Sequence, residues 1–290
     1  MLSCRGVSFA YKNKVVLSDV NLSLSKPCLV GIIGHNGSAK TTLLKILGSS
    51  LPCQTGELFL LGEQALNCQK LIKSQLRQQI GLLFQETSSD DKISVYDNLS
   101  FYGRLMGISK LSISIKQVLE RANLVGQAHE QVKKLSGGMI RRFELYRAFM
   151  HEPKILLLDE PSAGLDFAES AKFLTFARDY VVNNQAIVIF SSHRSAELEC
   201  CDDLIMMHEG RIIAHDSPDN LLSQSSRWRL SITDKHGEAK SLLSRDDLNK
   251  LLGSGQLIKA NIKSFSVSGP NVADVYAQVI GEIPPHEQPC

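Results

Sequence analysis

This sequence of 290 residues has no long hydrophobic run, since stretches such as Leu29–Ile33 and Ile155–Leu158 are far shorter than the roughly 20 residues of a membrane-spanning helix. It has no surplus of one charge either, because 32 basic residues nearly balance 30 acidic ones, so nothing indicates a nucleic-acid partner. Its start is polar at Ser3, Cys4 and Arg5, where a signal peptide would place a basic start and an apolar run. We therefore expect a globular protein that stays in the cytoplasm.

Cysteine is present but forms no recognisable pattern. The seven cysteines include no C-x-x-C pair and no histidine at zinc-ligand spacing, and their odd number favours reduced thiols. The neighbours Cys200 and Cys201 suggest a redox switch, but a disulfide between adjacent residues is strained. We favour two half-buried helix residues and assign them no chemistry.

Short runs rich in Val, Ile and Leu recur along the chain, and the later ones are separated by amphipathic stretches of helical length. This pattern is typical of an α/β fold whose strands are buried on both faces. Between Phe84 and Leu135 the spacing becomes helical, as in Tyr96–Met106 and Ile115–Leu124, which predicts an inserted helical subdomain over about residues 86–138. The strand-like runs are Val16–Leu24, Leu29–Ile33, Ile80–Phe84, Ile155–Leu158 and Ala186–Phe190.

The composition changes near residue 222. The Ser-rich stretch Ser223–Ser226 is interpreted as a linker between a first domain, residues 1–222, and a small C-terminal α+β domain, residues 223–290. The predicted elements of the second domain are strands at Trp228–Ile232 and Gln256–Val267 and helices at Arg245–Leu252 and Val272–Ile280.

A phosphate-binding loop is predicted directly after the run Leu29–Ile33. Its glycines would let backbone N–H groups turn inward around phosphate oxygens, and the helix that follows adds its dipole. Lys40 would hold the β- and γ-phosphates, and the Thr41 hydroxyl would ligate Mg²⁺. The pattern G-x-x-x-x-G-K-[ST] expects glycine where Ala39 stands; the alternative is an ordinary turn before a helix. The predicted nucleotide-binding residues are Gly34, His35, Asn36, Gly37, Ser38, Ala39, Lys40, Thr41 and Thr42.

Two carboxylates end a second apolar strand, Ile155–Leu158. Asp159 can bind Mg²⁺, directly or through water, while Glu160 can orient and polarise an attacking water. Taken alone, the pair is better explained as acidic turn residues, with which strands often end. The preceding phosphate-binding loop favours the catalytic interpretation.

A third motif lies between these two, at Leu135-Ser136-Gly137-Gly138-Met139. On its own, Ser-Gly-Gly is compatible with a simple helix N-cap. In this order, the motifs resemble those of ABC (ATP-binding cassette) transporter ATPases, whose signature is L-S-G-G-[QM]. The resemblance covers about residues 2–222 and implies a P-loop NTPase cassette with a mixed sheet core and an inserted helical subdomain.

The resemblance implies further site residues. Tyr11 corresponds to the aromatic residue that stacks on adenine, and Gln85 to the glutamine that joins Mg²⁺ to permease contacts. Asp166 corresponds to the residue that couples two sites, and His193 to the histidine on the γ-phosphate. Each has an ordinary explanation in isolation, as core, surface, turn and loop residue respectively. The implied metal ligands are Thr41, Gln85 and Asp159, the implied catalytic residues Glu160 and His193, and the cofactors ATP and Mg²⁺.

The family mechanism also implies partners. Ser136, Gly137 and Gly138 would close over the γ-phosphate bound by a partner's Gly34–Thr42 loop, so a homodimer or a heterodimer with a related ATPase is expected. A separate membrane permease is the other expected partner, which would place the chain on the inner face of the cell membrane. Nucleic acid is not an expected partner.

The branch of the family is indicated by three runs, Asp97–Gly107, Gly138–Leu145 and Gly269–Tyr276. They resemble the ATPases of ABC-2 type exporters of drugs, lipids or polysaccharides. One alternative is a regulatory or weakly active cassette, suggested by Ala39 alone. The other is a soluble cassette acting on nucleic acid or ribosomes, but such relatives usually carry paired cassettes or long coiled-coil insertions.

Overall fold

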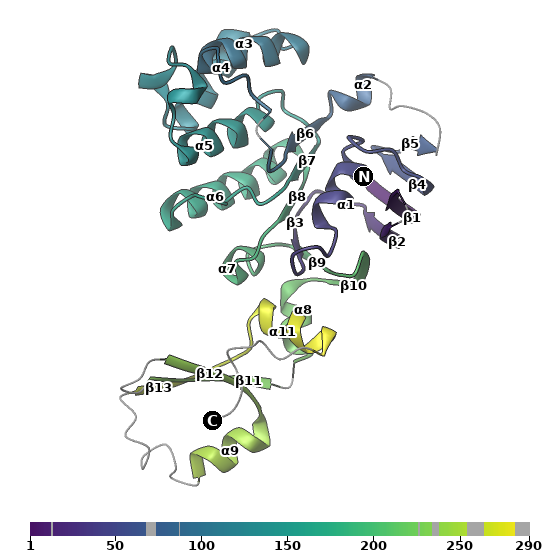
Figure 1. Cartoon of the computed structure of the whole chain (residues 1–290), viewed down its shortest axis with the longest axis vertical. Helices are drawn as coiled ribbons and strands as arrows, with labels where there is room; N and C mark the ends of the chain where they lie inside the picture. Colours follow the sequence, from purple (N-terminus) through teal and green to yellow (C-terminus); the bar gives the residue numbers. More distant parts are fainter. Residues whose placement is uncertain are drawn as a thin grey trace.

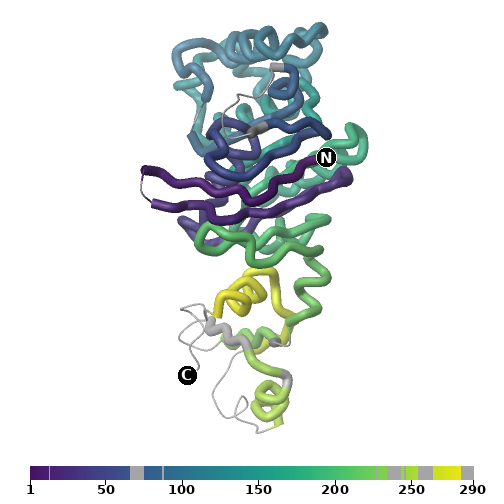
Figure 2. Tube along the Cα trace, turned by 90° about the vertical axis from the view of Figure 1, so that its right-hand side faces the viewer, coloured from purple at the N-terminus to yellow at the C-terminus, as the bar shows by residue number. Residues whose placement is uncertain are grey.

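The computed structural model describes residues 1–12, 14–67, 74–86, 88–225, 227–233, 238–253 and 264–281 of the chain. A helical group lies at one end, a body built on two sheets in the middle, and a smaller sheet at the other end (Figure 1, Figure 2). Within the residues just given, no helix is both long enough and apolar enough to cross a bilayer.

The central sheet has the order β10 (Arg211–Asp216), β9 (Asp203–His208), β3 (Cys28–Ile33), β8 (Ile187–Ser191), β7 (Ile155–Leu158) and β6 (Ile80–Leu83). Five strands run parallel and β10 runs antiparallel, so the sheet is mixed, as predicted. β3, β7 and β8 are buried along their whole length, because continuous apolar runs need cover on both faces. Carboxyl ends of parallel strands meet at one edge, where the loops after β3, β6, β7 and β8 converge.

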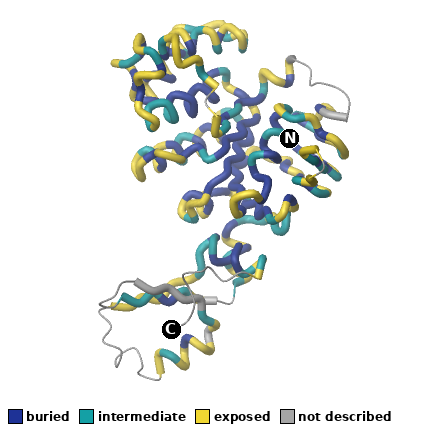
Figure 3. The backbone as a smooth tube through the Cα atoms, in the orientation of Figure 1, coloured by how far each residue is buried: buried dark blue, intermediate teal, exposed yellow. Residues whose placement is uncertain are grey.

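A second, antiparallel sheet has the order β2 (Lys14–Leu24), β1 (Leu2–Tyr11), β4 (Thr55–Leu60) and β5 (Glu63–Asn67). Helix α1 (Lys40–Leu47) packs against both sheets through fully buried Leu43, Leu44, Ile46 and Leu47. The largest hydrophobic core of the molecule therefore surrounds the helix that follows the predicted phosphate-binding loop. Figure 3 shows this buried centre in dark blue.

The other face of the central sheet is covered by α6 (Phe167–Asn184) and the end of α5 (Gly137–Ala148). The predicted helical subdomain is confirmed: its helices share a core of their own, separate from that of the sheets. The helix predicted at Ile115–Leu124 instead runs from Leu111 to Arg121 and stops before Asn123, whose φ of 54° is left-handed. The remaining elements of this subdomain are α3 (Val95–Leu105), α4 (Leu111–Arg121), η1 (Val125–Gln127) and η2 (Val132–Lys134), whereas the short α2 (Ser74–Arg77) packs its Leu76 into the core around α1.

The C-terminal part begins after α8 (Pro218–Ser223), which ends at the predicted domain boundary. A small antiparallel sheet has the order β12 (Glu238–Ser244), β11 (Arg227–Thr233) and β13 (Ser264–Ser268), with α9 (Arg245–Gly253) beside it. The first part of the strand predicted at Gln256–Val267 lies outside the described residues. The last helix, α11 (Val272–Ile280), packs on the first domain, against α7 (Ser195–Leu198), α8, β3 and β9.

The cysteines of the described ranges form no disulfide among themselves. Cys200 is exposed and Cys201 is buried, and both follow the end of α7, so the prediction of two half-buried helix residues was wrong. Burial raises the pKa of the Cys201 thiol, which keeps this group protonated at neutral pH.

Candidate functional site

The loop between β3 and α1 is closely packed at its base and open at its tip. A Cβ atom at Gly34 would lie 2.5 Å from the carbonyl oxygen of Met207 in β9, so only glycine fits at this position. Gly37 has a φ of +85°, a conformation that glycine adopts without strain. His35, Asn36 and Gly37 are exposed, whereas the residues that follow them are buried. The tip of the loop is therefore exposed to solvent, while close packing holds its base in place.

The Lys40 ammonium lies inside this loop. Its Nζ donates to the carbonyl oxygen of Gly34 at 2.7 Å and to that of His35 at 3.2 Å. Burial lowers the pKa of Lys40, and the nearby carboxylates of Glu160 and Asp159 oppose that shift. The Lys40 ammonium is thus a buried positive charge at the place where the resemblance expects phosphate oxygens to bind.

Ala39 adopts a left-handed conformation, with φ 78° and ψ 20°. For a residue with a Cβ atom this costs roughly 1–2 kcal/mol, a strain that glycine does not have. Its side chain packs with the core around α1, and the residue also lines the cavity described below. Ala39 therefore differs from the expected glycine in two ways, because it carries a Cβ atom and its backbone is strained.

Asp159 follows β7 and is almost fully buried. Its Oδ2 accepts a hydrogen bond from Thr41 Oγ1 at 2.6 Å, and its Oδ1 accepts one from Ser191 Oγ at 2.7 Å. Hydroxyl and carboxylate oxygens are the hard donors that Mg²⁺ prefers, and the amide of Gln85 lines the cavity beside Thr41. In the part of the chain that the structure covers, no group of three or more His, Cys, Asp or Glu residues forms a metal site alone. These residues fit an ion that takes its other ligands from water and phosphate.

Glu160 and His193 lie side by side at the carboxyl ends of β7 and β8. Glu160 Oε1 and His193 Nε2 are 3.1 Å apart. Glu160 has a left-handed φ of 49°, and its N–H donates to Ser191 Oγ at 2.8 Å. The loops thus bring together the two residues to which the sequence assigned catalysis, and they hold the backbone of one of them in an uncommon conformation.

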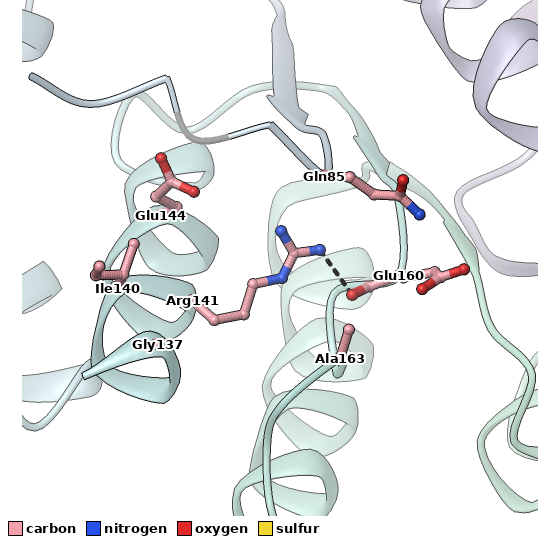
Figure 4. A pocket seen from close by; sticks show the side chains of 7 residues that line it. All are labelled: Gln85, Gly137, Ile140, Arg141, Glu144, Glu160 and Ala163. Atoms are coloured by element: carbon pink, nitrogen blue, oxygen red, sulfur yellow. Dashed lines mark hydrogen bonds between the residues drawn. The ribbon is translucent and has the colours of Figure 1, made fainter.

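Arg141 of α5 is hydrogen-bonded to this backbone, a role that the sequence did not indicate. Its guanidinium donates to the carbonyl oxygens of Phe84 at 3.0 Å and Glu160 at 2.6 Å, and also to that of Asp159. Figure 4 shows the contact with Glu160. One side chain therefore joins the helical subdomain to the loops after β6 and β7.

Two cavities meet at this edge of the sheet. The larger, about 950 Å³, has walls formed by Tyr11, the loop with Lys40, Gln85 and Glu160. Its size is at the upper end of the range for small-molecule sites. Tyr11 is about half exposed, and its ring packs edge-on against Phe9. The smaller cavity, about 350 Å³, is lined by Gln85, Gly137, Ile140, Arg141, Glu144, Glu160 and Ala163 (Figure 4).

The structure does not bring every predicted residue to the larger cavity. Ser136 caps α5 by accepting the N–H of Met139 at 3.3 Å, and Ser136 and Gly137 are exposed. Asp166 caps α6 in the same way, through the N–H of Glu169 at 2.8 Å. Among the described residues that line the larger cavity, none comes from the start of α5 or from the loop before α6.

Ser191 is a further residue that the sequence analysis missed. It ends an apolar strand and bonds to both Asp159 and Glu160, so its hydroxyl fixes the two carboxylate-bearing residues relative to β8. A serine at the end of a buried strand, two residues before a predicted catalytic histidine, was the available signal.

Comparisons with known proteins show which proteins the chain resembles in sequence and fold. The profile of the ABC transporter family matches residues 17–163. The chain is 33% identical to the ABC transporter ATP-binding protein NatA of Bacillus subtilis, over 73% of this chain and 87% of that protein. It is 31% identical to the Nod factor export ATP-binding protein I of Rhizobium johnstonii, over 95% of this chain and 93% of that protein. A solved ATP-binding subunit of an ABC transporter has the same fold, with a TM-score of 0.69 at 22% identity over 77% of this chain and 92% of that one.

Proposed function

The chain belongs to the ABC transporter family, as an ATP-binding subunit, and we propose that it hydrolyses ATP to power export through a separate membrane permease. The observation that carries this proposal is the convergence of four loops at one edge of the central sheet. These loops and the start of α1 carry Lys40, Thr41, Gln85, Asp159, Glu160 and His193.

In this proposal the larger cavity binds ATP. Tyr11 stacks on adenine at the open side, and backbone N–H groups of the loop after His35 bind phosphate oxygens together with the dipole of α1. The Lys40 ammonium exchanges its bonds to loop carbonyls for bonds to the β- and γ-phosphates. Each exchange replaces a neutral acceptor by an anionic one, which strengthens the hydrogen bond.

Thr41, Gln85 and Asp159 would hold Mg²⁺, which when bound would neutralise charge on the phosphate oxygens. Glu160 orients a water for attack on the γ-phosphorus and accepts its proton as the bond to the bridging oxygen breaks. His193 donates to an oxygen of the γ-phosphate. The Ser191 and Arg141 contacts hold the Glu160 backbone still during this step.

We further propose a dimer, either of this chain with itself or with a related ATPase. Ser136–Gly138 at the start of α5 are the predicted γ-phosphate contacts, yet none of the three lines the chain's own larger cavity. Their N–H groups and the helix dipole form a suitable anion site for a partner's nucleotide. A two-fold arrangement would complete both sites at once.

Export rather than import is supported by a relative named for Nod factor export, which aligns with almost the whole chain, including its C-terminal part. Drugs, lipids and polysaccharides remain the candidate substrates, and the chain would act on the inner face of the cell membrane. The weakly active alternative rests on Ala39 alone. We favour full turnover, because Lys40, Thr41, Asp159 and Glu160 are all present. Thr41 is hydrogen-bonded to Asp159, and Lys40 and Glu160 line the same cavity.

The test begins by purifying the chain from its own membranes with the permease that copurifies with it. The pair is placed in proteoliposomes with the ATPase outside, and ATP turnover and uptake of a fluorescent amphiphile into the lumen are measured. Uptake that requires MgATP and is lost in Lys40→Ala supports export. Turnover without uptake, or release from preloaded vesicles, would contradict export, whereas failure to bind ATP would contradict the whole proposal.

A further inference from the structure

We infer that Tyr276, in the last helix of the C-terminal part, is a positioning residue of the phosphate-binding loop and sets the affinity of the site for ATP. This inference rests on the proposed function, because it concerns how the same loop binds its nucleotide. It gives the C-terminal part of the chain a role in ATP binding that the motifs of the first domain do not indicate.

The Tyr276 hydroxyl is hydrogen-bonded to backbone groups on both sides of the base of the loop. It accepts the backbone N–H of His35 at 3.2 Å and donates to the carbonyl oxygen of Met207 at 3.0 Å. That same carbonyl is the one that leaves no space for a side chain at Gly34. One buried hydroxyl thus joins the first turn of the loop to β9, although it lies 241 positions along the chain from His35.

The helix that carries Tyr276 is fixed firmly enough to act in this way. Val272, Val275 and Tyr276 are buried in one hydrophobic cluster with Ile33, the residue directly before the loop, and with Met206 of β9. The phenol ring is therefore packed against the strand end from which the loop starts. A hydroxyl on a packed ring has a fixed position and can determine where the His35 N–H points.

The start of α11 contacts the other side of the site. The Ala273 N–H donates to Ser195 Oγ at 3.4 Å, and the Val272 N–H donates to Glu199 Oε1 at 3.3 Å. Ser195 begins α7, two residues after His193. A single helix of nine residues therefore spans from the histidine loop to the phosphate-binding loop.

The small sheet is tied to the same helix by an ion pair whose carboxylate is buried and whose guanidinium is partly exposed. Arg229 of β11 donates to both carboxylate oxygens of Asp274, the nearer contact through its Nη2 and the other, from Nε, at 3.1 Å. Asp274 also accepts the N–H of Asn271 at 2.8 Å, which completes the cap of α11. A displacement of the sheet would therefore move α11, and with it the Tyr276 hydroxyl.

The loop depends on this hydroxyl because the His35 N–H is in the segment that must direct its backbone toward phosphate. Without Tyr276 Oη, the first turn of the loop keeps the bond from the Ser38 N–H to the His35 carbonyl oxygen, at 3.1 Å. It loses its hydrogen-bonded link to β9 at the same time and keeps only the looser edge-on contact between the His35 and His208 rings, whose centroids are 5.0 Å apart. We expect weaker binding of ATP with little effect on the chemical step, since Glu160 and His193 are positioned by other contacts.

The decisive variant is Tyr276→Phe, which keeps the ring and removes only the hydroxyl. A matched control is Tyr180→Phe in α6, whose hydroxyl is also buried and donates to a backbone carbonyl, that of Pro153, at 2.9 Å. Both variants lose one buried hydroxyl and its bond to a carbonyl oxygen, but only one of them touches the loop.

The full chain is used, with its permease for turnover. Titration with MgATP and steady-state rates are measured for the native chain and both variants, together with thermal unfolding and hydrogen exchange at the His35 amide. We expect Tyr276→Phe to raise the Kd and KM for ATP about fivefold to tenfold, to change kcat less than about twofold, and to speed exchange at His35. Tyr180→Phe should leave all of these unchanged, even where it lowers the unfolding temperature.

Equal Kd values for the native chain and Tyr276→Phe would overturn the inference and leave the proposed function intact. An equal loss of affinity in both variants would also overturn it, since the effect would then follow general stability. Absence of ATP binding by the native chain would instead contradict the proposed function, and the inference with it.

Discussion

Replacing Ala39 by glycine tests the one departure from the expected loop pattern. The substitution removes a left-handed strain of roughly 1–2 kcal/mol, which favours the folded state. It also removes a methyl group packed in the core around α1, at a cost of about 0.8 kcal/mol. The two effects largely cancel, so the free energy of unfolding should rise by no more than about 1 kcal/mol, a shift of roughly 2–4 °C in the unfolding temperature.

Affinity for ATP should change more than stability does. Without a Cβ atom, the loop N–H before Lys40 can approach the β-phosphate more closely, and one charge-assisted hydrogen bond is worth roughly 1.5–3 kcal/mol. We therefore expect Ala39→Gly to tighten the Kd for MgATP by about tenfold or more, and to raise turnover at low ATP. Isothermal titration and steady-state ATPase rates in the presence of the permease measure both.

The control is Ser49→Gly, just past the other end of α1. Ser49 also has a left-handed φ, 55°, and its buried hydroxyl lacks a hydrogen-bond partner in the described structure. Glycine there should stabilise the fold and leave the affinity for ATP unchanged. Equal affinities of the native chain and Ala39→Gly would show that the loop accommodates the methyl group, and our steric reasoning would be wrong.

Three further results are expected. Glu160→Gln should bind ATP and form a stable dimer in gel filtration, but lose most turnover, because it keeps the shape and removes the proton acceptor; near-normal hydrolysis would exclude this role. Ser191→Ala should lower kcat more than tenfold with little change in KM, since the Glu160 N–H loses its acceptor while the Arg141 contact alone does not fix the carboxylate; a pure KM effect would refute this. Burial lowers the pKa of His151 to about 4, below its ordinary 6.5, so the free energy of unfolding should fall by about 1–2 kcal/mol from pH 7 to 5. In urea titrations at several pH values, His151→Gln should reduce this dependence on pH. The same dependence in the variant and the native chain would contradict the prediction.

The sign of the pH effect follows from which state binds the proton more strongly. The folded chain keeps His151 neutral, with Nδ1 3.2 Å from the Tyr102 hydroxyl and Nε2 3.1 Å from the Ile80 carbonyl oxygen. Below pH 6.5 the unfolded chain takes up a proton that the folded chain takes up only near pH 4. Stability is therefore full above the unfolded pKa and is lost as the pH falls toward the folded one.

The sequence was most informative where a local pattern determines the structure. β3, β7 and β8 were predicted because uninterrupted apolar runs are compatible only with burial on both faces. β1 and β4 were not predicted, because only alternate residues of these strands are fully buried and their pattern is interrupted by bulges. Alternation indicates a half-buried strand only where it runs unbroken, and each bulge shifts the side chains that follow to the other face.

The residues of the site likewise fall into those that the sequence indicated and those that it did not. The order of motifs indicated Lys40, Asp159 and Glu160, because each lies directly after a recognisable strand or loop. Arg141 and Tyr276 act through carbonyl oxygens and N–H groups of distant segments, and a backbone group leaves no mark in a sequence. Only the tertiary structure could connect them to the loops that they hold.

The contacts of Arg141 have a consequence for which mutations can compensate one another. Its three acceptors among the described residues are all main-chain carbonyl oxygens, so changing the residues that carry them cannot restore a lost partner. Lysine would preserve the charge but has a single nitrogen in place of a planar fork. Suppressors of an Arg141 defect should therefore arise elsewhere, in residues that stiffen the two loops by other means, and a genetic screen would find few revertants within the motif itself.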